Sequence, residues 1–185
     1  MADKIKILGI SGSLREGSFN TAALKAAQEL CPDDAEIEIY PIDGFPSFNQ
    51  DLEAQPPAKV TEFKAKIREA DSIVISSPEY NYSVPGVLKN AIDWASRPYG
   101  DSAWDGKPAL IMGASGGAIA TGRMQYHLRQ IMVFLNMHPL NKPEVMIGFA
   151  HEKVDASGKL TDQATRDHIR GALEALIAWT RKLKG

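Results

Sequence analysis

The sequence is poor in the residues that build several common kinds of site. It has one cysteine, Cys31, so it can form neither an internal disulfide nor a cysteine-ligated metal centre. Its four histidines show no spacing typical of metal ligands. We therefore expect no bound metal and a packing role for Cys31. A lone thiol also suits a reducing compartment, which predicts a cytoplasmic protein.

Charge of one sign and long apolar runs are also missing. The 21 basic and 23 acidic residues leave a net charge of −2, too small to attract nucleic acid or an anionic membrane surface. No apolar run approaches the ~18 residues of a membrane-spanning helix. The N-terminal residues lead directly into a short apolar run, so we expect no signal peptide. These features predict that neither nucleic acid nor a membrane is a partner.

Hydrophobic residues, in contrast, are plentiful and periodic. With 44% hydrophobic residues in a chain of 185, we expect residues 1–185 to form one domain with an ample core. Apolar runs that predict strands alternate with stretches of helical periodicity. The predicted strands are Lys4–Ile10, Glu36–Tyr40, Ser72–Ser76, Ala109–Ala114 and Val145–Phe149. The predicted helices are Thr21–Leu30, Ala58–Ala70, Val87–Ser96, Arg123–Leu135 and Thr161–Leu183.

This alternation predicts an α/β fold, in which a parallel sheet is covered by helices on both faces. Right-handed crossovers leave two doubly wound strand orders. The short units and the absence of a sixth predicted strand favour a five-stranded sheet of order 2-1-3-4-5. Ligands of such a sheet bind at the carboxyl ends of strands one, three and four.

The segment Ser11–Asn20, after the first predicted strand, has more hydrogen-bond donors than a turn needs. The donors are side chains of Ser11, Ser13, Arg15, Ser18 and Asn20. The segment opens a helix, whose free N–H groups and positive end favour an anion, and a phosphate monoester would satisfy them all. The alternative is a structural turn, in which Gly12 and Gly17 shape the loop and Ser18 or Asn20 caps the helix.

The loop alone leaves the owner of the phosphate open. No Gly-Lys-Ser or Gly-Lys-Thr follows it, so it is not a P-loop. The glycines Gly9, Gly12 and Gly17 do not fit the G-x-G-x-x-G pattern of dinucleotide sites. Without that pattern we interpret Asp43, which lies where such a fold binds ribose, as a turn residue.

Two further loops are expected at the same edge of the sheet. The first, Ser77–Gly86, carries Tyr80 and Tyr82, which are costly in a loop unless something flat packs on them. The second, Ser115–Gly122, has glycines that let a planar ligand approach backbone N–H groups. A flat aromatic ring on a phosphate tether fits the three loops together, and FMN is the simplest such ligand.

These motifs resemble the NADPH-dependent FMN reductase family of flavodoxin-like folds, especially its bacterial quinone and chromate reductase branch. The resemblance runs almost from end to end. It lies in Gly12-Ser13-Leu14-Arg15 with Ser18 and Asn20, in the segments Pro78–Gly86 and Leu88–Trp94, and in Gly106-Lys107-Pro108.

The resemblance implies a set of contacts with FMN. The phosphate is held by Ser13, Arg15, Ser18, Phe19 and Asn20. The isoalloxazine ring is lined by Pro78, Glu79, Tyr80 and Asn81. The third flavin loop begins at Ser115 and Gly116.

The implied activity is reduction of quinones and other small oxidants, such as chromate, azo or nitro compounds, by NADPH or NADH through noncovalent FMN. The chain has no second nucleotide-binding motif, which predicts ping-pong use of one open flavin face. No catalytic side chain is required, and Glu79 is interpreted as a brace for its loop. The alternatives are a flavodoxin-type electron carrier and a non-catalytic flavin sensor.

Large side chains in the segments that leave the sheet predict a homo-oligomer with the flavin near a subunit boundary. They are Phe45, Pro46, Phe48, Tyr82, Val84, Trp94, Pro98 and Tyr99. The alternative is that they fold back over their own domain. The resemblance implies dimers that pair into tetramers, with Arg123, Tyr126 and Glu144 as candidates for a polar network between dimers.

Overall fold

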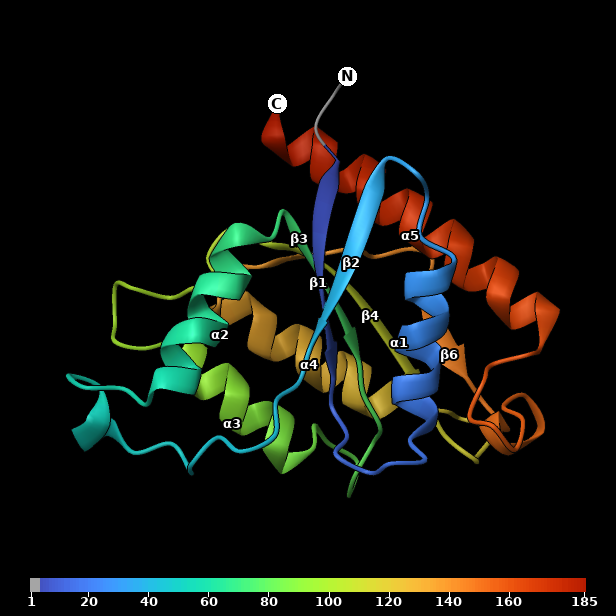
Figure 1. The fold of residues 1–185 in the computed structure, drawn as a ribbon, viewed down its shortest axis with the longest axis horizontal. Coiled ribbons are helices and arrows are strands. Elements are labelled where there is room, and N and C mark those ends of the chain that lie inside the picture. The colour runs from blue at the N-terminus through green and yellow to red at the C-terminus, as the bar shows by residue number, and fades with distance from the viewer. Residues whose placement is uncertain (1–3) are drawn as a thin grey trace.

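Strands and helices alternate along the chain around a central parallel sheet (Figure 1). The computed structural model describes residues 4–185, and the three residues before them, part of the segment in which we expect no signal peptide, lie outside the described residues. The strands are β1 (Ile5–Ser11), β2 (Ala35–Tyr40), β3 (Ser72–Ser76), β4 (Pro108–Ala114), β5 (His138–Pro139) and β6 (Val145–Ile147). The helices are α1 (Phe19–Glu29), α2 (Ala58–Glu69), α3 (Gly86–Ala95), α4 (Gly122–Phe134) and α5 (Gln163–Lys184), with 3-10 turns at Gln50–Leu52 and Ala150–Glu152.

The strand order is β2-β1-β3-β4-β5, with every pairing parallel and β6 also paired to β4. The predicted order 2-1-3-4-5 and flavodoxin-like architecture are therefore confirmed. All strands that carry the predicted loops end at the same edge of the sheet, the lower edge in Figure 1.

The edge position beside β4 differs from the prediction of one strand, Val145–Phe149. Two short strands share it: β5 pairs with the start of β4 and β6 with its end. Pro139 and Pro143 have no N–H to donate to a ladder, so pairing lapses between the two strands. The second strand ends at Ile147, because Phe149 adopts a left-handed φ of 50°.

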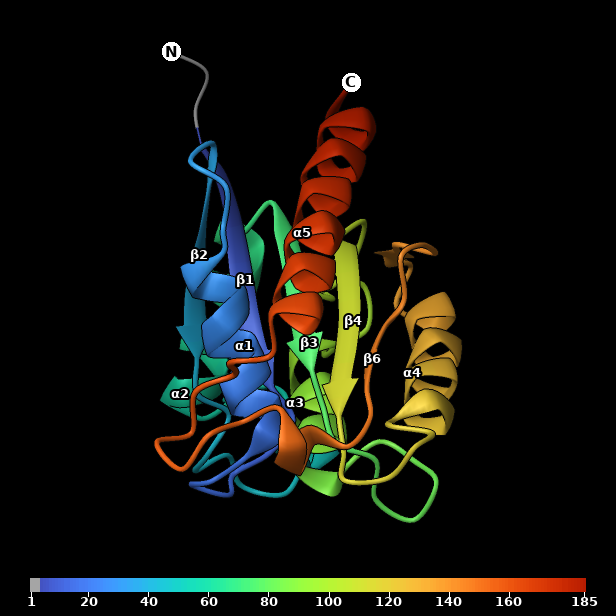
Figure 2. The ribbon, with the colours of Figure 1, turned by 90° about the vertical axis from the view of Figure 1, so that its right-hand side faces the viewer.

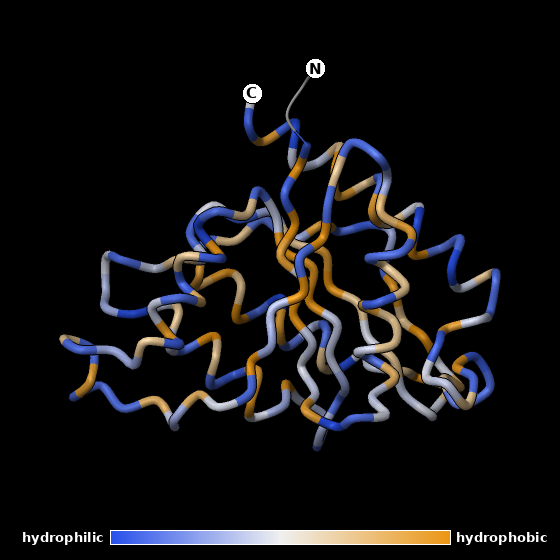
Figure 3. The backbone as a smooth tube through the Cα atoms, in the orientation of Figure 1, coloured by the Kyte–Doolittle hydropathy of each residue, from blue (hydrophilic) through white to orange (hydrophobic). Residues whose placement is uncertain are grey.

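The helices form a layer on each face of the sheet. Helices α1 and α5 cover one face, and α2, α3 and α4 cover the other (Figure 2). The middle strand β3 alternates between them, with Val74 in the core under α1 and α5 and with Ile73 and Ile75 in the opposite core. Hydrophobic residues accordingly concentrate along the central strands, while the peripheral loops are mostly hydrophilic (Figure 3). Within residues 4–185, no helix combines the length and apolar character needed to cross a membrane.

Helix α1 begins two residues earlier than the apolar periodicity predicts. Ser18 is its N-cap, and the Ser18 hydroxyl accepts hydrogen bonds from the N–H groups of Asn20 and Thr21 at 3.2 and 3.3 Å. This cap satisfies N–H groups that a helix otherwise leaves free. Ser18 therefore caps the helix, as expected if the loop is a structural turn.

Several large side chains outside the sheet fold back over their own domain. Phe45 packs on Phe63 with ring centroids 5.4 Å apart, and Phe48 packs edge-on against Trp94 at 5.1 Å. Trp94 is buried and donates a hydrogen bond to the carbonyl of Pro46 at 2.8 Å. These side chains therefore contribute to the core of one chain and no longer point to an interface.

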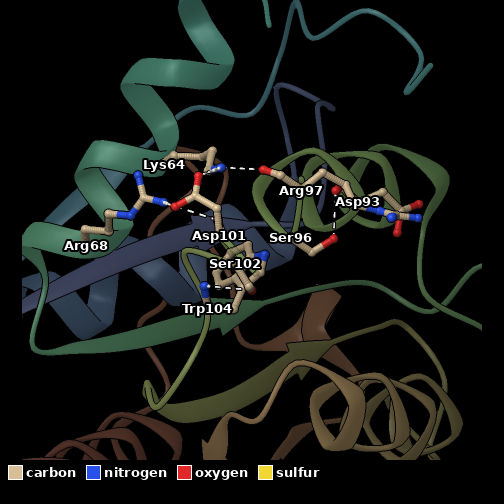
Figure 4. Close-up of polar contacts among 8 residues, drawn as sticks. All are labelled: Lys64, Arg68, Asp93, Ser96, Arg97, Asp101, Ser102 and Trp104. Atoms are coloured by element: carbon tan, nitrogen blue, oxygen red, sulfur yellow. Dashed lines mark hydrogen bonds and ion pairs between the residues drawn. The ribbon is translucent and has the colours of Figure 1, made fainter. Parts of the chain in front are cut away.

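A buried lysine joins α2 to the loop after α3 (Figure 4). Lys64 contacts the Asp101 carboxylate at 2.7 Å and also donates to the carbonyl of Arg97, while Arg68 contacts the other carboxylate oxygen at 2.5 Å. The hydrogen bond from Lys64, with a further contribution from Arg68, lowers the pKa of Asp101 below its ordinary value. Asp101 thus stabilises the fold as a carboxylate.

We expect Asp101→Asn to lower the free energy of unfolding at pH 7 by about 1.5 kcal/mol, because Lys64 stays buried without its anion. The native pKa of Asp101 is depressed, so its contribution is present above the unfolded pKa and fades as the pH falls through the native value. The difference from the wild type should therefore shrink below about pH 4. Urea unfolding of both proteins at pH 7 and pH 3 measures this difference in the free energy of unfolding. Asp33→Asn, at an exposed aspartate that forms no ion pair within residues 4–185, is the control and should change little at either pH.

Candidate functional site

The three predicted loops are tied together where β1, β3 and β4 end. The N–H of Gly12 donates to the carbonyl of Ser76 at 2.8 Å, and the N–H of Ser77 donates to the carbonyl of Met112 at 3.1 Å. A Cβ at Gly12 would lie 2.3 Å from the Ser77 hydroxyl oxygen, so only glycine allows this approach. The loops therefore form one continuous surface at the sheet edge.

The loop after β1 presents a set of free backbone donors. Within residues 4–185, the N–H groups of Leu14, Glu16, Gly17 and Phe19 have no hydrogen-bond partner. They lie at the positive end of α1, which favours an anion. The nearby Arg15 is exposed, and its guanidinium rests 5.2 Å from the centre of the Phe19 ring. This segment is an anion cradle with an exposed cation beside it.

The serine hydroxyls of this loop already have protein partners. Ser11 shares a 2.8 Å hydrogen bond with the hydroxyl of Thr21, and the Ser13 hydroxyl accepts the N–H of Arg15 at 3.3 Å. Ser18 is the helix cap described above. A hydroxyl that accepts a bond can still donate its own proton, so Ser13 and Ser18 keep a donor for a ligand. Thr21 also belongs to this network. The sequence did not identify it, because the prediction rested on the composition of the segment Ser11–Asn20, which ends one residue before Thr21.

Asn20 is placed differently from the other predicted phosphate residues. Its carboxamide is buried and pairs with both backbone groups of Ala114, at 2.9 Å to the carbonyl and 2.8 Å to the N–H. Ala114 is the last residue of β4. The side chain therefore binds protein, at the base of the loop that follows β4.

The loop after β3 turns through a tight hairpin. Tyr80 and Ser83 exchange backbone hydrogen bonds of 3.1 and 3.0 Å, with Asn81 and Tyr82 between them at φ values of 50° and 63°. Both intervening residues are left-handed, as in a type I′ turn. Pro78, two residues before the turn, is buried, while the two tyrosine rings are exposed. The hairpin offers aromatic surface at the same sheet edge as the anion cradle.

Glu79 anchors this hairpin to α4. One carboxylate oxygen accepts the N–H of Met124 at 3.0 Å, and the other lies 3.2 Å from the Arg123 guanidinium. The guanidinium also lies 4.1 Å from the centre of the Tyr82 ring. With only 10% of its side chain exposed, Glu79 is held at a helix N-terminus, where a carboxylate is stabilised. The carboxylate serves as a brace.

The loop after β4 is fixed by Ser115. Its N–H donates to the carbonyl of Ile147 at 3.0 Å, and its hydroxyl donates to the carbonyl of Ala120 at 2.9 Å. Gly116 is exposed, and a Cβ there would lie 3.6 Å from His151. His151 lies in the segment after β6. The sequence did not indicate that this segment lies beside the site, because it carries no local motif.

An anion cradle, a tyrosine hairpin and a glycine loop at this edge define a flavodoxin-like mononucleotide-binding protein. Residues 5–152 match the family described as NADPH-dependent FMN reductase, and the chain belongs to this family. It is therefore an oxidoreductase that uses FMN and NAD(P)H, which disfavours the electron-carrier and sensor alternatives.

Individual relatives match along the whole chain. An NAD(P)H-dependent FMN reductase of Pseudomonas aeruginosa is 54% identical over 187 residues, and a quinone reductase of Escherichia coli K12 is 44% identical over 188 residues; both alignments cover 100% of each chain. The structure of FerB, a flavoenzyme NAD(P)H:(acceptor) oxidoreductase from Paracoccus denitrificans, superposes with a TM-score of 0.88 at 35% identity, covering 96% of this chain and 98% of FerB.

The residues present fit FMN on grounds that are independent of these relatives. The free N–H groups of the anion cradle and Arg15 suit a phosphate with about two negative charges. Tyr80, Tyr82 and Gly116 are exposed, so a planar ring can approach the two loops that carry them. Phosphate donors and aromatic surface thus occur at one sheet edge, as a mononucleotide requires.

Proposed function

We propose that the protein reduces quinones with electrons from NAD(P)H, through FMN held by the three loops at the sheet edge. The observation that carries this proposal is the set of free N–H groups at the start of α1, next to Arg15 and the tyrosine hairpin. The relatives named as quinone reductases support a quinone as the acceptor. Chromate, azo and nitro compounds are further small oxidants that such a site would admit.

In this proposal each loop has one task. Phosphate is bound by Arg15, by the hydroxyls of Ser13 and Ser18, and by the free N–H group of Phe19. Pro78, Glu79, Tyr80 and Asn81 line the ring, with backbone groups that reach its polar edge, and the third flavin loop begins at Ser115 and Gly116. FMN, when bound, supplies hydride acceptance at N5 and onward electron transfer. The protein orients the ring and donates hydrogen bonds to its polar atoms, and no side chain acts as acid or base.

NAD(P)H and the quinone are expected to use the same surface in turn, because the sequence has no second nucleotide-binding motif. Initial rates at several fixed quinone concentrations, plotted against NADPH as double reciprocals, should give parallel lines. Intersecting lines would mean that both substrates bind together, and the shared-site proposal would fail.

We also propose that the chain forms a homo-oligomer, a dimer or tetramer, with its site near a subunit boundary. The support is an apolar surface on α4, where Val133 and Phe134 are 81% and 75% exposed and Tyr126 is also exposed. Exposed patches of this kind commonly mark interfaces. Arg123, one turn from Tyr126, and Glu144 stay candidates for a polar network between dimers.

Light scattering coupled to size-exclusion chromatography tests the oligomer. We expect a mass of two or four chains for the wild type and a smaller mass for Phe134→Glu, which places a charge in the apolar surface. Leu52→Glu, at an exposed leucine outside α4, is the control and should keep the wild-type mass. A wild-type particle of one chain mass at micromolar concentration, with FMN bound and activity intact, would show that no interface is needed.

Two broader proposals complete this assignment. Residues 1–185 act as a single FMN-binding domain, because the loops and both cores draw on segments from across the chain. The protein works in the cytoplasm, a proposal supported by its single free cysteine, Cys31.

A further inference from the structure

The side chain of Asn20 joins two of the three loops of the site. Its Nδ2 donates to the carbonyl of Ala114 at 2.9 Å, and its Oδ1 accepts the N–H of Ala114 at 2.8 Å. The hydroxyl of Ser76, at the end of β3, lies 3.5 Å from the same oxygen. Only 3% of Asn20 is exposed, so water does not compete for this pairing.

The pairing of Asn20 with Ala114 extends the sheet beside the end of β4, where β3 has already ended. Strand β3 ends at Ser76, opposite Met112, so Gly113 and Ala114 extend beyond their neighbour on that side. Asn20 supplies one donor and one acceptor there, as a residue of an adjacent strand would.

The other side of the same strand end is held by different partners. The N–H of Ser115 donates to Ile147, and its carbonyl accepts the N–H of Ala150 at 2.9 Å. Backbone groups of successive residues in an extended strand point to alternate sides, so Ala114 and Ser115 face opposite partners. Asn20 is therefore the contact that ties the start of the glycine loop to the phosphate loop.

We propose that Asn20 is a positioning residue, which holds the glycine loop, Ser115–Gly117, at a fixed distance from the phosphate loop, Ser13–Phe19. The two ends of the FMN site are thereby aligned before the cofactor binds. This inference rests on the assignment of both loops to FMN under the proposed function. It gives the carboxamide a task other than contact with phosphate, since such a contact would break its pairing with Ala114.

The test compares the affinities of FMN and riboflavin, which lacks the phosphate, measured by quenching of flavin fluorescence. Asn20→Ala should weaken both by about tenfold, because the loop beside the ring loses its alignment. Asn20→Asp, which keeps the size but loses the donor to Ala114, should do the same. A loss of affinity for FMN alone would make Asn20 a phosphate contact and overturn the proposal, and unchanged affinity for both flavins would also overturn it.

Asp101→Asn is the control that distinguishes a positioning effect from a general loss of stability, because it is expected to destabilise the fold far from these loops. This variant should bind both flavins like the wild type. If it weakened riboflavin as much as Asn20→Ala does, the effect of Asn20 would be one of stability and the proposal would fail.

Hydrogen exchange on the flavin-free chain gives a readout that does not depend on the cofactor. In Asn20→Ala the amides of Ser115–Gly117 should exchange about tenfold faster than in the wild type, while the 3-10 turn Gln50–Leu52, which precedes α2, should be unchanged. Equal exchange of Ser115–Gly117 in the two proteins would overturn the positioning role. A wild type that binds no FMN would instead count against the proposed function, so the two failures are distinguishable.

Discussion

Arg15→Ala should weaken FMN binding by about 10- to 150-fold, the equivalent of a charge-assisted contact of about 1.5–3 kcal/mol. The guanidinium is exposed and rests on the Phe19 ring, so it is available to the phosphate. The FMN affinity of Arg15→Lys should lie between those of the wild type and Arg15→Ala, because lysine keeps the charge but loses the bidentate geometry. Titration of the flavin-free protein with FMN, followed by fluorescence quenching, gives the dissociation constants.

Two controls make this result specific. Riboflavin has no phosphate, so its affinity should be the same for Arg15→Ala and the wild type. Lys25→Ala removes an exposed cation from helix α1, which follows the phosphate loop, and should leave FMN affinity unchanged. If Arg15→Ala kept its full affinity for FMN, the phosphate would have to be bound elsewhere.

Gly113→Ala should lower the free energy of unfolding by about 3 kcal/mol, the upper part of the range for overpacked cores. A Cβ at this position would lie 2.1 Å from the Thr121 hydroxyl oxygen and 2.5 Å from the carbonyl oxygen of Ser77. The carbonyl belongs to the backbone and cannot rotate away, so β4 must separate from the loop after β3. We expect FMN binding to weaken as well, because that loop belongs to the proposed FMN site. Urea unfolding and FMN titration measure the two effects.

The matched control for this substitution is Gly171→Ala. Gly171 lies inside α5, and a Cβ added there would have no neighbouring atom within 4 Å outside its own helix backbone, so alanine is accommodated. Its higher helix propensity should raise the free energy of unfolding by about 0.8 kcal/mol. A Gly113→Ala protein as stable as the wild type would show that the loops are less tightly joined than described.

The fold was predictable because its signals are local. Apolar runs separated by helical periodicity define a parallel sheet, and right-handed crossovers restrict its order. The split edge strand was not predicted, because β5 is only two residues long and its pairing depends on the position of β4. The core role of Phe48 and Trp94 was only one of two alternatives, since the sequence does not show which surface a loop side chain meets.

The meeting of the three loops of the candidate site at one sheet edge was predictable. Glycines, serines and tyrosines are dense after strands one, three and four, and the topology brings these strand ends together. The roles of single side chains depend on contacts between distant parts of the chain. Asn20 meets Ala114 and Glu79 meets Met124, and no local pattern at either residue predicts its partner.

The central claim is that this sheet edge holds an FMN that NAD(P)H reduces and a quinone reoxidises. Anaerobic absorption spectroscopy of the purified protein, supplied with FMN and freed of excess, tests it most directly. We predict that flavin absorption stays with the protein, is bleached by one equivalent of NADPH and returns when a quinone is added. A protein that retains no flavin, or whose bound flavin NADPH and NADH leave unchanged, would contradict this account.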